Sequence, residues 1–189
     1  MAQDTGFSSP IPSNLEVMRA VAGRIGRSVG QQIHEADSIS VAVVVYPLDH
    51  AWYIERALLE EMQQRGFRVT AGTGSNYLME FGLSNLKVEY SNVRRNGLFG
   101  PRVLDRKIIV QMSVKIVPVD PMGAVIANEF LEENRDTILV SEVQTVESPA
   151  LPVTHGTIPP ESFFSHFAEP LVMIGALAVG IYLLFTVRS

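Results

Sequence analysis

Apolar positions recur every three or four residues in the segment that follows Ser13. This stripe consists of Leu15, Met18, Ala22, Ile25, Val29 and Ile33. The spacing predicts an amphipathic helix. Ser13 followed by Glu16 is a capping box, in which each side chain satisfies a backbone donor of the other residue, and it marks the start of the helix. Gly23, Gly26 and Gly30 weaken this helix, but we expect them to let it lie close against a sheet.

A β-α-β unit is predicted next. Residues 38–48 contain a nearly continuous run of β-branched side chains, which is typical of a strand covered on both faces. Residues 50–66 read as a helix whose apolar side includes Trp52, Leu58, Leu59 and Met62, with Gly66 as its C-cap. Residues 67–71 form a second, shorter strand. The short unit is compatible with a parallel crossover.

In the third part of the chain, apolar and polar residues alternate along the sequence, as they do in strands with one buried face. Leu86, Val88 and Tyr90 share one face of a first strand. Residues 106–119 form a second strand, with Ile108, Val110, Met112, Val114 and Ile116 directed inward. A turn at 120–123 leads into a returning strand over 124–133. The expected fold class is therefore α/β (α+β), a mixed sheet with two helices on a β-α-β unit plus an antiparallel meander.

The C-terminal segment has a different composition. No charged residue occurs over 170–187, and the length suits a single transmembrane helix that completes the expected fold. Its anchor residues are Leu171, Ile174, Leu177, Ile181 and Leu184. Ala176 and Gly180 form a small-xxx-small pair that would let two such helices pack into a homo-oligomer, although Gly and Ala are also common in membrane helices.

The predicted organisation has four parts. A flexible leader (1–12) precedes an α/β globular domain (13–148), a Pro-rich linker (149–162) and a membrane anchor (163–189). The charge rule predicts an extracytoplasmic, periplasmic domain, since acidic residues precede the apolar run and Arg188 follows it. Because the N-terminal segment does not resemble a signal peptide, a cytosol-facing, tail-anchored protein is the alternative.

Composition and motifs argue against catalysis. The chain has no cysteine, and its net charge of −5 gives no reason to expect nucleic acid as a partner. Gly72 and Gly74 begin a phosphate-loop pattern, but Tyr77 occupies the position of its last glycine. The four histidines are scattered without metal-ligand spacing. We therefore expect a non-enzymatic protein with no cofactor and no metal; a ligand-binding or sensory domain with a cleft near 72–77 is the alternative.

Residues 92–107 stand out as a candidate contact surface. We expect a loop here that places arginines around an apolar pair, and arginine and aromatic residues are enriched at interfaces. The predicted partner-binding residues are Arg94, Arg95, Leu98, Phe99 and Arg102, with Arg106 beside them. The loop would dock a protein partner or touch an anionic lipid surface. The remaining interpretation is that Leu98 and Phe99 pack back onto the domain and the arginines are solvated.

The stretch "SISVAVVVYPLDHAWYIERALLEEMQQRGFRV" over 38–69, together with "RKIIVQMSVKIVPVDPMGAVIANEFLEE" over 106–133, resembles a class of envelope domains. This class includes the curli-secretion lipoprotein, the N-terminal domain of TolB and the lipoprotein activators of penicillin-binding proteins. The chain lacks the N-terminal lipoprotein cysteine of that class. The resemblance implies an envelope domain that binds proteins and does no chemistry. Together with the predicted anchor and contact surface, we expect a subunit or assembly factor of a membrane protein complex.

Overall fold

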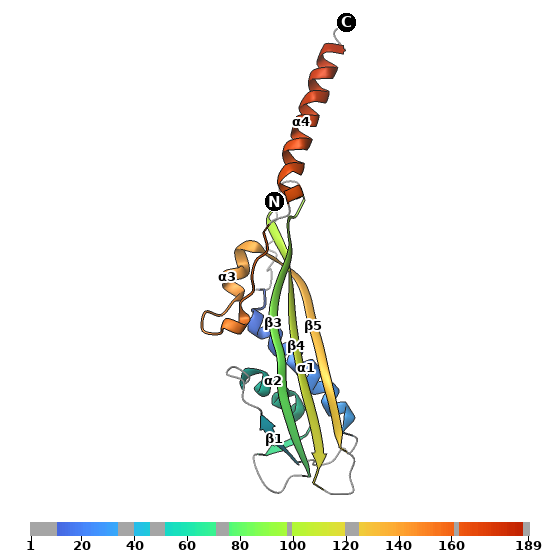
Figure 1. Cartoon of the computed structure of the whole chain (residues 1–189), viewed down its shortest axis with the longest axis vertical. Helices are drawn as coiled ribbons and strands as arrows, with labels where there is room; N and C mark the ends of the chain where they lie inside the picture. The colour runs from blue at the N-terminus through green and yellow to red at the C-terminus, as the bar shows by residue number, and fades with distance from the viewer. Residues whose placement is uncertain are drawn as a thin grey trace, which may run out of the picture.

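The computed structural model describes residues 11–33, 40–45, 52–70, 76–97, 100–119, 125–160 and 163–186. These residues form one five-stranded mixed sheet with helices packed on one of its faces (Figure 1). The strands are β1 (Ser40–Val45), β2 (Arg68–Thr70), β3 (Tyr77–Arg95), β4 (Arg102–Pro118) and β5 (Ile126–Leu139).

The sheet has the strand order β2-β1-β3-β4-β5. The short strand β1 lies parallel to both β2 and β3, whereas β3, β4 and β5 form a long antiparallel meander. Two register shifts interrupt the pairing of β3 with β4, one between Leu83 and Asn85 and one between Ser91 and Arg94. The second shift lies beside the candidate site described below.

Helix α1 (Asn14–Gln32) and helix α2 (Trp52–Gln64) cover the inner face of the sheet. The predicted capping box is confirmed, because the Ser13 hydroxyl accepts from the Glu16 backbone N–H at 3.2 Å while the Glu16 carboxylate accepts from the Ser13 backbone N–H at 2.7 Å. The predicted inward positions of β4 are also confirmed as buried, and they are Ile108, Val110, Met112, Val114 and Ile116. The opposite, outer face carries mostly charged and polar residues.

The glycines of α1 face α2, which differs from the expectation that they would lie against the sheet. A Cβ built on Gly26 would lie 3.3 Å from the carbonyl oxygen of Leu58, and one on Gly30 would lie 3.0 Å from Cδ of Arg65. The two helices therefore approach closely, because a side chain at these positions of α1 would separate them.

Residues 92–107 are largely strand, and the loop expected over this whole stretch is wrong. β3 continues to Arg95 and β4 begins at Arg102. The backbone N–H of Asn96 donates to the carbonyl oxygen of Pro101 at 2.9 Å. The physical reason is that both strands extend their antiparallel ladder around a bulge.

After β5 the chain folds back across the inner face through η1 (Val140–Glu142), α3 (Val143–Val146) and η2 (Pro152–Thr154). We call residues 147–160 the strap. Leu151 and Val153 pack against the core and Thr154 is fully buried. Much of the segment expected to be a linker is thus attached to the domain.

The last helix, α4 (Phe163–Thr186), projects beyond the end of the sheet (Figure 1). Among the residues that the structure describes, no helix is both long enough and apolar enough to cross a membrane. The prediction of a transmembrane helix over 170–187 is corrected accordingly. The predicted membrane location, the tail anchor and the periplasmic domain depended on that helix and are corrected with it.

Candidate functional site: the hairpin pocket

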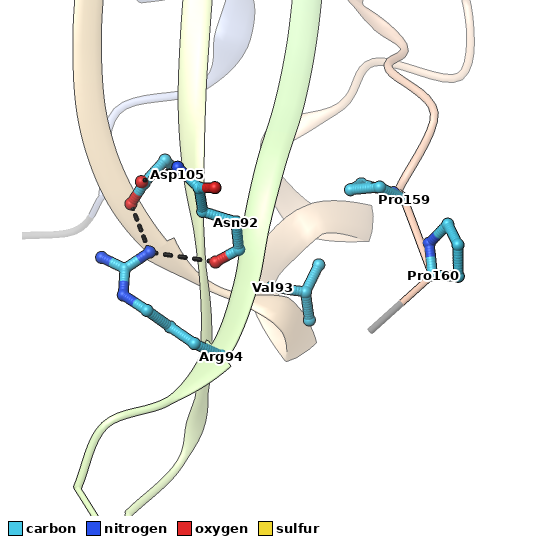
Figure 2. A pocket seen from close by; sticks show the side chains of 6 residues that line it. All are labelled: Asn92, Val93, Arg94, Asp105, Pro159 and Pro160. Atoms are coloured by element: carbon cyan, nitrogen blue, oxygen red, sulfur yellow. Dashed lines mark hydrogen bonds and ion pairs between the residues drawn. The ribbon is translucent and has the colours of Figure 1, made fainter. Parts of the chain in front are cut away.

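A hollow of about 490 Å³ opens at the base of the β3–β4 hairpin. We call it the hairpin pocket, and it is lined by Asn92, Val93, Arg94, Asp105, Pro159 and Pro160. Figure 2 shows Val93 directed from β3 toward the two prolines of the strap, while Arg94 lies on the other side of the strand beside Asp105. The pocket thus combines an apolar wall with a charged one, and the two walls come from segments far apart in the sequence.

Asp105 organises the charged wall. Its carboxylate accepts hydrogen bonds from Arg94 Nη1 at 2.7 Å, from Asn92 Nδ2 at 2.9 Å and from Thr137 Oγ1 at 3.0 Å. These bonds, the one from Asn92 first, hold the pKa of Asp105 below its ordinary value. The carboxylate therefore stays ionised and fixes the side chains of three residues from β3 and β5.

The bulge in β3 places these groups. Asn92 has a φ of +52°, a left-handed conformation that asparagine tolerates better than most residues. Its backbone carbonyl accepts a second bond from Arg94 Nη1 at 3.0 Å. The Arg94 guanidinium is consequently held by two acceptors (Figure 2) while 46% of the side chain stays exposed. Such an arginine is oriented in advance and still accessible to a partner.

Behind the pocket lies a buried polar network centred on Arg106, whose side chain is fully buried. The guanidinium is bonded to both carboxylate oxygens of Asp136 on β5, and its Nη1 donates at 2.9 Å to Asn14 Oδ1 and to the carbonyl oxygen of Pro12. The Asn14 amide donates in turn to the Tyr90 hydroxyl at 2.8 Å and to the Thr154 carbonyl oxygen at 2.7 Å. One network therefore joins α1, β3, β4, β5 and the strap.

The strap is held in place by a second set of bonds. The Glu147 carboxylate accepts from the Gly156 backbone N–H at 2.9 Å and lies 4.0 Å from Nδ1 of His155. Gly156 packs on the ring of Tyr90, where an added Cβ would lie 2.7 Å from Cδ2 of that ring. Because Pro159 and Pro160 follow only a few residues later, these contacts position the apolar wall of the pocket.

The structure brings one of the five predicted partner-binding residues into the pocket, namely Arg94. Arg95 and Arg102 face each other as a cross-strand pair at the end of the hairpin, and each has further interactions within the chain. Leu98 and Phe99 lie outside the described residues, as do Gly72 and Gly74 of the alternative cleft. Arg106, expected in the same loop, is instead a buried strand residue.

The remaining predicted residues lie on α4. Ile174, Leu177, Ile181 and Leu184 are more than half exposed. Ala176 is exposed as well. A Cβ on Gly180 would meet nothing within 4 Å, so none of the described domain packs there. The side chain of Leu171 lies outside the described set.

Four further residues line the pocket that the sequence pattern does not mark as members of a site: Asn92, Asp105, Pro159 and Pro160. Asp105 occupies an outward position of β4, opposite Thr137, and only the strand register reveals this neighbour. The described residues contain no group of three metal-ligating side chains. The pocket combines the oriented guanidinium of Arg94 with the apolar wall of Val93 and the two prolines, and a guanidinium of this kind can bind a carboxylate.

The comparisons with known proteins add no family. No protein-family model matches the chain, and no curated protein is detectably similar to it.

Proposed function

We propose that this chain is a non-enzymatic subunit or assembly factor of a protein complex and that it binds its partner at the hairpin pocket. The observation that carries the proposal is Arg94, which is fixed by Asp105 and the Asn92 carbonyl and yet remains 46% exposed beside a hollow. Arginines held in this way lose little conformational freedom on binding, which favours affinity. The resemblance to envelope domains that bind proteins points in the same direction.

The chemistry of the pocket selects the kind of partner. In an acidic chain of net charge −5, three arginines gather at this end of the sheet, on the two strands of one hairpin, at positions 94, 95 and 102. A partner segment with an Asp or Glu side chain would form a charge-assisted bond with Arg94. An adjacent apolar residue of that segment would contact Val93 and the prolines of the strap.

A photo-crosslinking experiment tests this proposal. A photoreactive amino acid replaces Asn96 at the end of the hairpin in the full-length chain, in the cells that produce it. We expect a discrete crosslinked product that mass spectrometry identifies as a protein partner. The product should weaken strongly when Arg94→Glu is added, because the substitution reverses the charge presented to the partner.

The control carries the photoreactive residue at Ala127, an exposed position of β5 at the opposite end of the sheet. Crosslinks that appear equally at both positions indicate contact without specificity. An Asn96 product that is unchanged by Arg94→Glu would contradict the proposed role of the pocket, provided that circular dichroism shows the variant to be folded.

A further inference from the structure

Helix α2 carries the only tryptophan of the chain on its outer side. The pattern placed Trp52 with the apolar residues of this helix, and the structure corrects this, because the side chain is 61% exposed while Leu58 and Met62 are fully buried. An exposed tryptophan is unusual, since burial of this ring is strongly favourable. It is also the residue type most enriched at binding hot spots.

The tryptophan belongs to a built surface. A hollow of about 360 Å³ lies along α2, and the residues that line it define what we call the Trp52 surface: Trp52, Glu55, Arg56, Leu59, Glu60 and Gln63. Their spacing of three and four residues places them on one side of the helix. The aromatic ring is at the N-terminal end of the hollow, and the half-buried Leu59 lies two turns further along.

The Trp52 surface carries two carboxylates and one arginine, so one carboxylate is not compensated on this surface. Arg56 Nε donates to Glu60 Oε1 at 2.7 Å, so these two residues compensate each other. Glu55 forms no ion pair or hydrogen bond with the part of the chain that the structure describes, and it lies in the first turn of α2 beside Trp52. The carboxylate there offsets the partial positive charge of the helix N-terminus, which would otherwise repel a cation.

We infer that the Trp52 surface binds a basic segment of a protein partner. An arginine or lysine of that segment would lie on the indole ring of Trp52 and pair with Glu55, since cations are attracted to the face of tryptophan and to carboxylates. A neighbouring apolar side chain of the segment would contact Leu59. This surface takes a ligand of the opposite charge to the one proposed for the hairpin pocket, so its test is independent of that proposal.

Because Trp52 is the only tryptophan, its fluorescence reports on this surface directly. The full-length chain is titrated with an octa-arginine peptide at near-physiological salt, and octa-glutamate serves as the comparison. We expect a saturable change in tryptophan emission with octa-arginine and none with octa-glutamate. Glu55→Gln should weaken the binding about three- to tenfold, the range expected for the loss of one partly exposed charge contact.

The matched control is Glu129→Gln, which removes one negative charge from an exposed position on the outer face of β5. It should leave the affinity nearly unchanged. Equal weakening by both variants would overturn the inference, since it would show that the peptide responds to net charge alone. No emission change with octa-arginine would overturn it as well. Trp52→Leu, followed by calorimetry and checked for folding by circular dichroism, should weaken binding at least as much as Glu55→Gln.

Discussion

Arg106 on β4 donates a hydrogen bond of 2.9 Å to the side-chain oxygen of Asn14 on α1, although 92 residues separate them in the sequence. The same guanidinium binds Asp136, so the start of the first helix and the last strand are joined through one buried cation. Burial of a charge is costly unless all its hydrogen-bonding groups have partners. Here the donors reach a carboxylate, an amide oxygen and a backbone carbonyl, which compensates for that cost.

Arg106→Met tests this network. The substitution keeps much of the volume but leaves Asp136 without its cation and the Asn14 oxygen without its donor. We expect the free energy of unfolding to fall by about 3–5 kcal/mol, as for other buried pairs that lose one partner. Urea denaturation followed by circular dichroism measures the change. Arg135→Met is the control, since that arginine is on the exposed face of the same sheet and should change stability by less than about 1 kcal/mol.

Removal of the hydroxyl group should change the stability of the protein differently at two buried tyrosines, Tyr90 and Tyr53. The Tyr90 hydroxyl accepts from Asn14, so Tyr90→Phe should destabilise the protein by about 1–2 kcal/mol. Within the described structure the Tyr53 hydroxyl is buried with no hydrogen-bond partner, so Tyr53→Phe should be neutral or stabilising. Thermal unfolding of the two variants side by side gives the comparison. Similar destabilisation by both would show that Tyr53 has a partner as well.

Alkaline titration measures the pKa values of the same two tyrosines and is independent of the unfolding experiment. Burial raises the pKa of Tyr53 and of Tyr90 to about 12 from the ordinary value of 10.0. The folded state thus favours the neutral phenol, and this contribution to stability is fully present below pH 10.0 and is lost as the pH rises through about 12. Ultraviolet absorbance at rising pH should show that Tyr53 and Tyr90 ionise late, and each Phe variant should remove one late-ionising phenol.

Much of the architecture follows from local patterns. The capping box at Ser13 and Glu16 marks the start of α1, and the alternation around Ile108 and Val110 identifies the buried face of β4. These signals are local, since each depends on residues within a turn or two of the same element. The first half of β3 was not predicted, because Gly82 and the bulge between Leu83 and Asn85 interrupt the alternation of apolar and polar residues there.

The candidate site was much harder to predict, for a physical reason. Arg106 occupies an inward position of β4, but an arginine is ordinarily exposed, so its burial depends on Asp136 at the facing position of the neighbouring strand. The two prolines belong to a strap in which Gly156 packs directly on the ring of Tyr90, a residue more than 60 positions away in the sequence. Such long-range pairings appear once the strand register is known, and no local pattern encodes them.

Gly156 and Gly23 provide a matched pair of glycine substitutions. Gly156→Ala would place a Cβ 2.7 Å from the Tyr90 ring, so the strap must shift, and we expect a loss of about 1–3 kcal/mol. Gly23 lies in the interior of α1, where the nearest atom to an added Cβ is a carboxylate oxygen at 3.8 Å. Gly23→Ala should therefore stabilise the protein by up to about 1 kcal/mol. Urea denaturation of both variants measures the contrast, and destabilisation by Gly23→Ala would show that the contact with α2 is tighter than described.

The lowered pKa of Asp105 predicts how the stability of the folded protein depends on pH. Its pKa is lowered in the folded protein, chiefly by the hydrogen bond from Asn92 and also by those from Arg94 and Thr137. A lowered pKa means that the ionised carboxylate stabilises the folded state above the unfolded pKa of about 3.9, and that this stabilisation is lost as the pH falls through the folded value. Asp105→Asn removes the ionisation while it keeps the shape of the side chain.

The measurement compares wild type with Asp105→Asn from pH 7 down to pH 3, at each pH by urea denaturation. The difference in stability should be constant at neutral pH, because Asp105 is ionised in both the folded and the unfolded states there. It should shrink once the pH falls below about 3.9, where the unfolded chain takes up a proton and the folded chain does not. Other carboxylates titrate in the same range, but they are common to both proteins and cancel in the difference. A difference that does not change with pH would show that Asn92 and Arg94 do not hold the carboxylate in its ionised form.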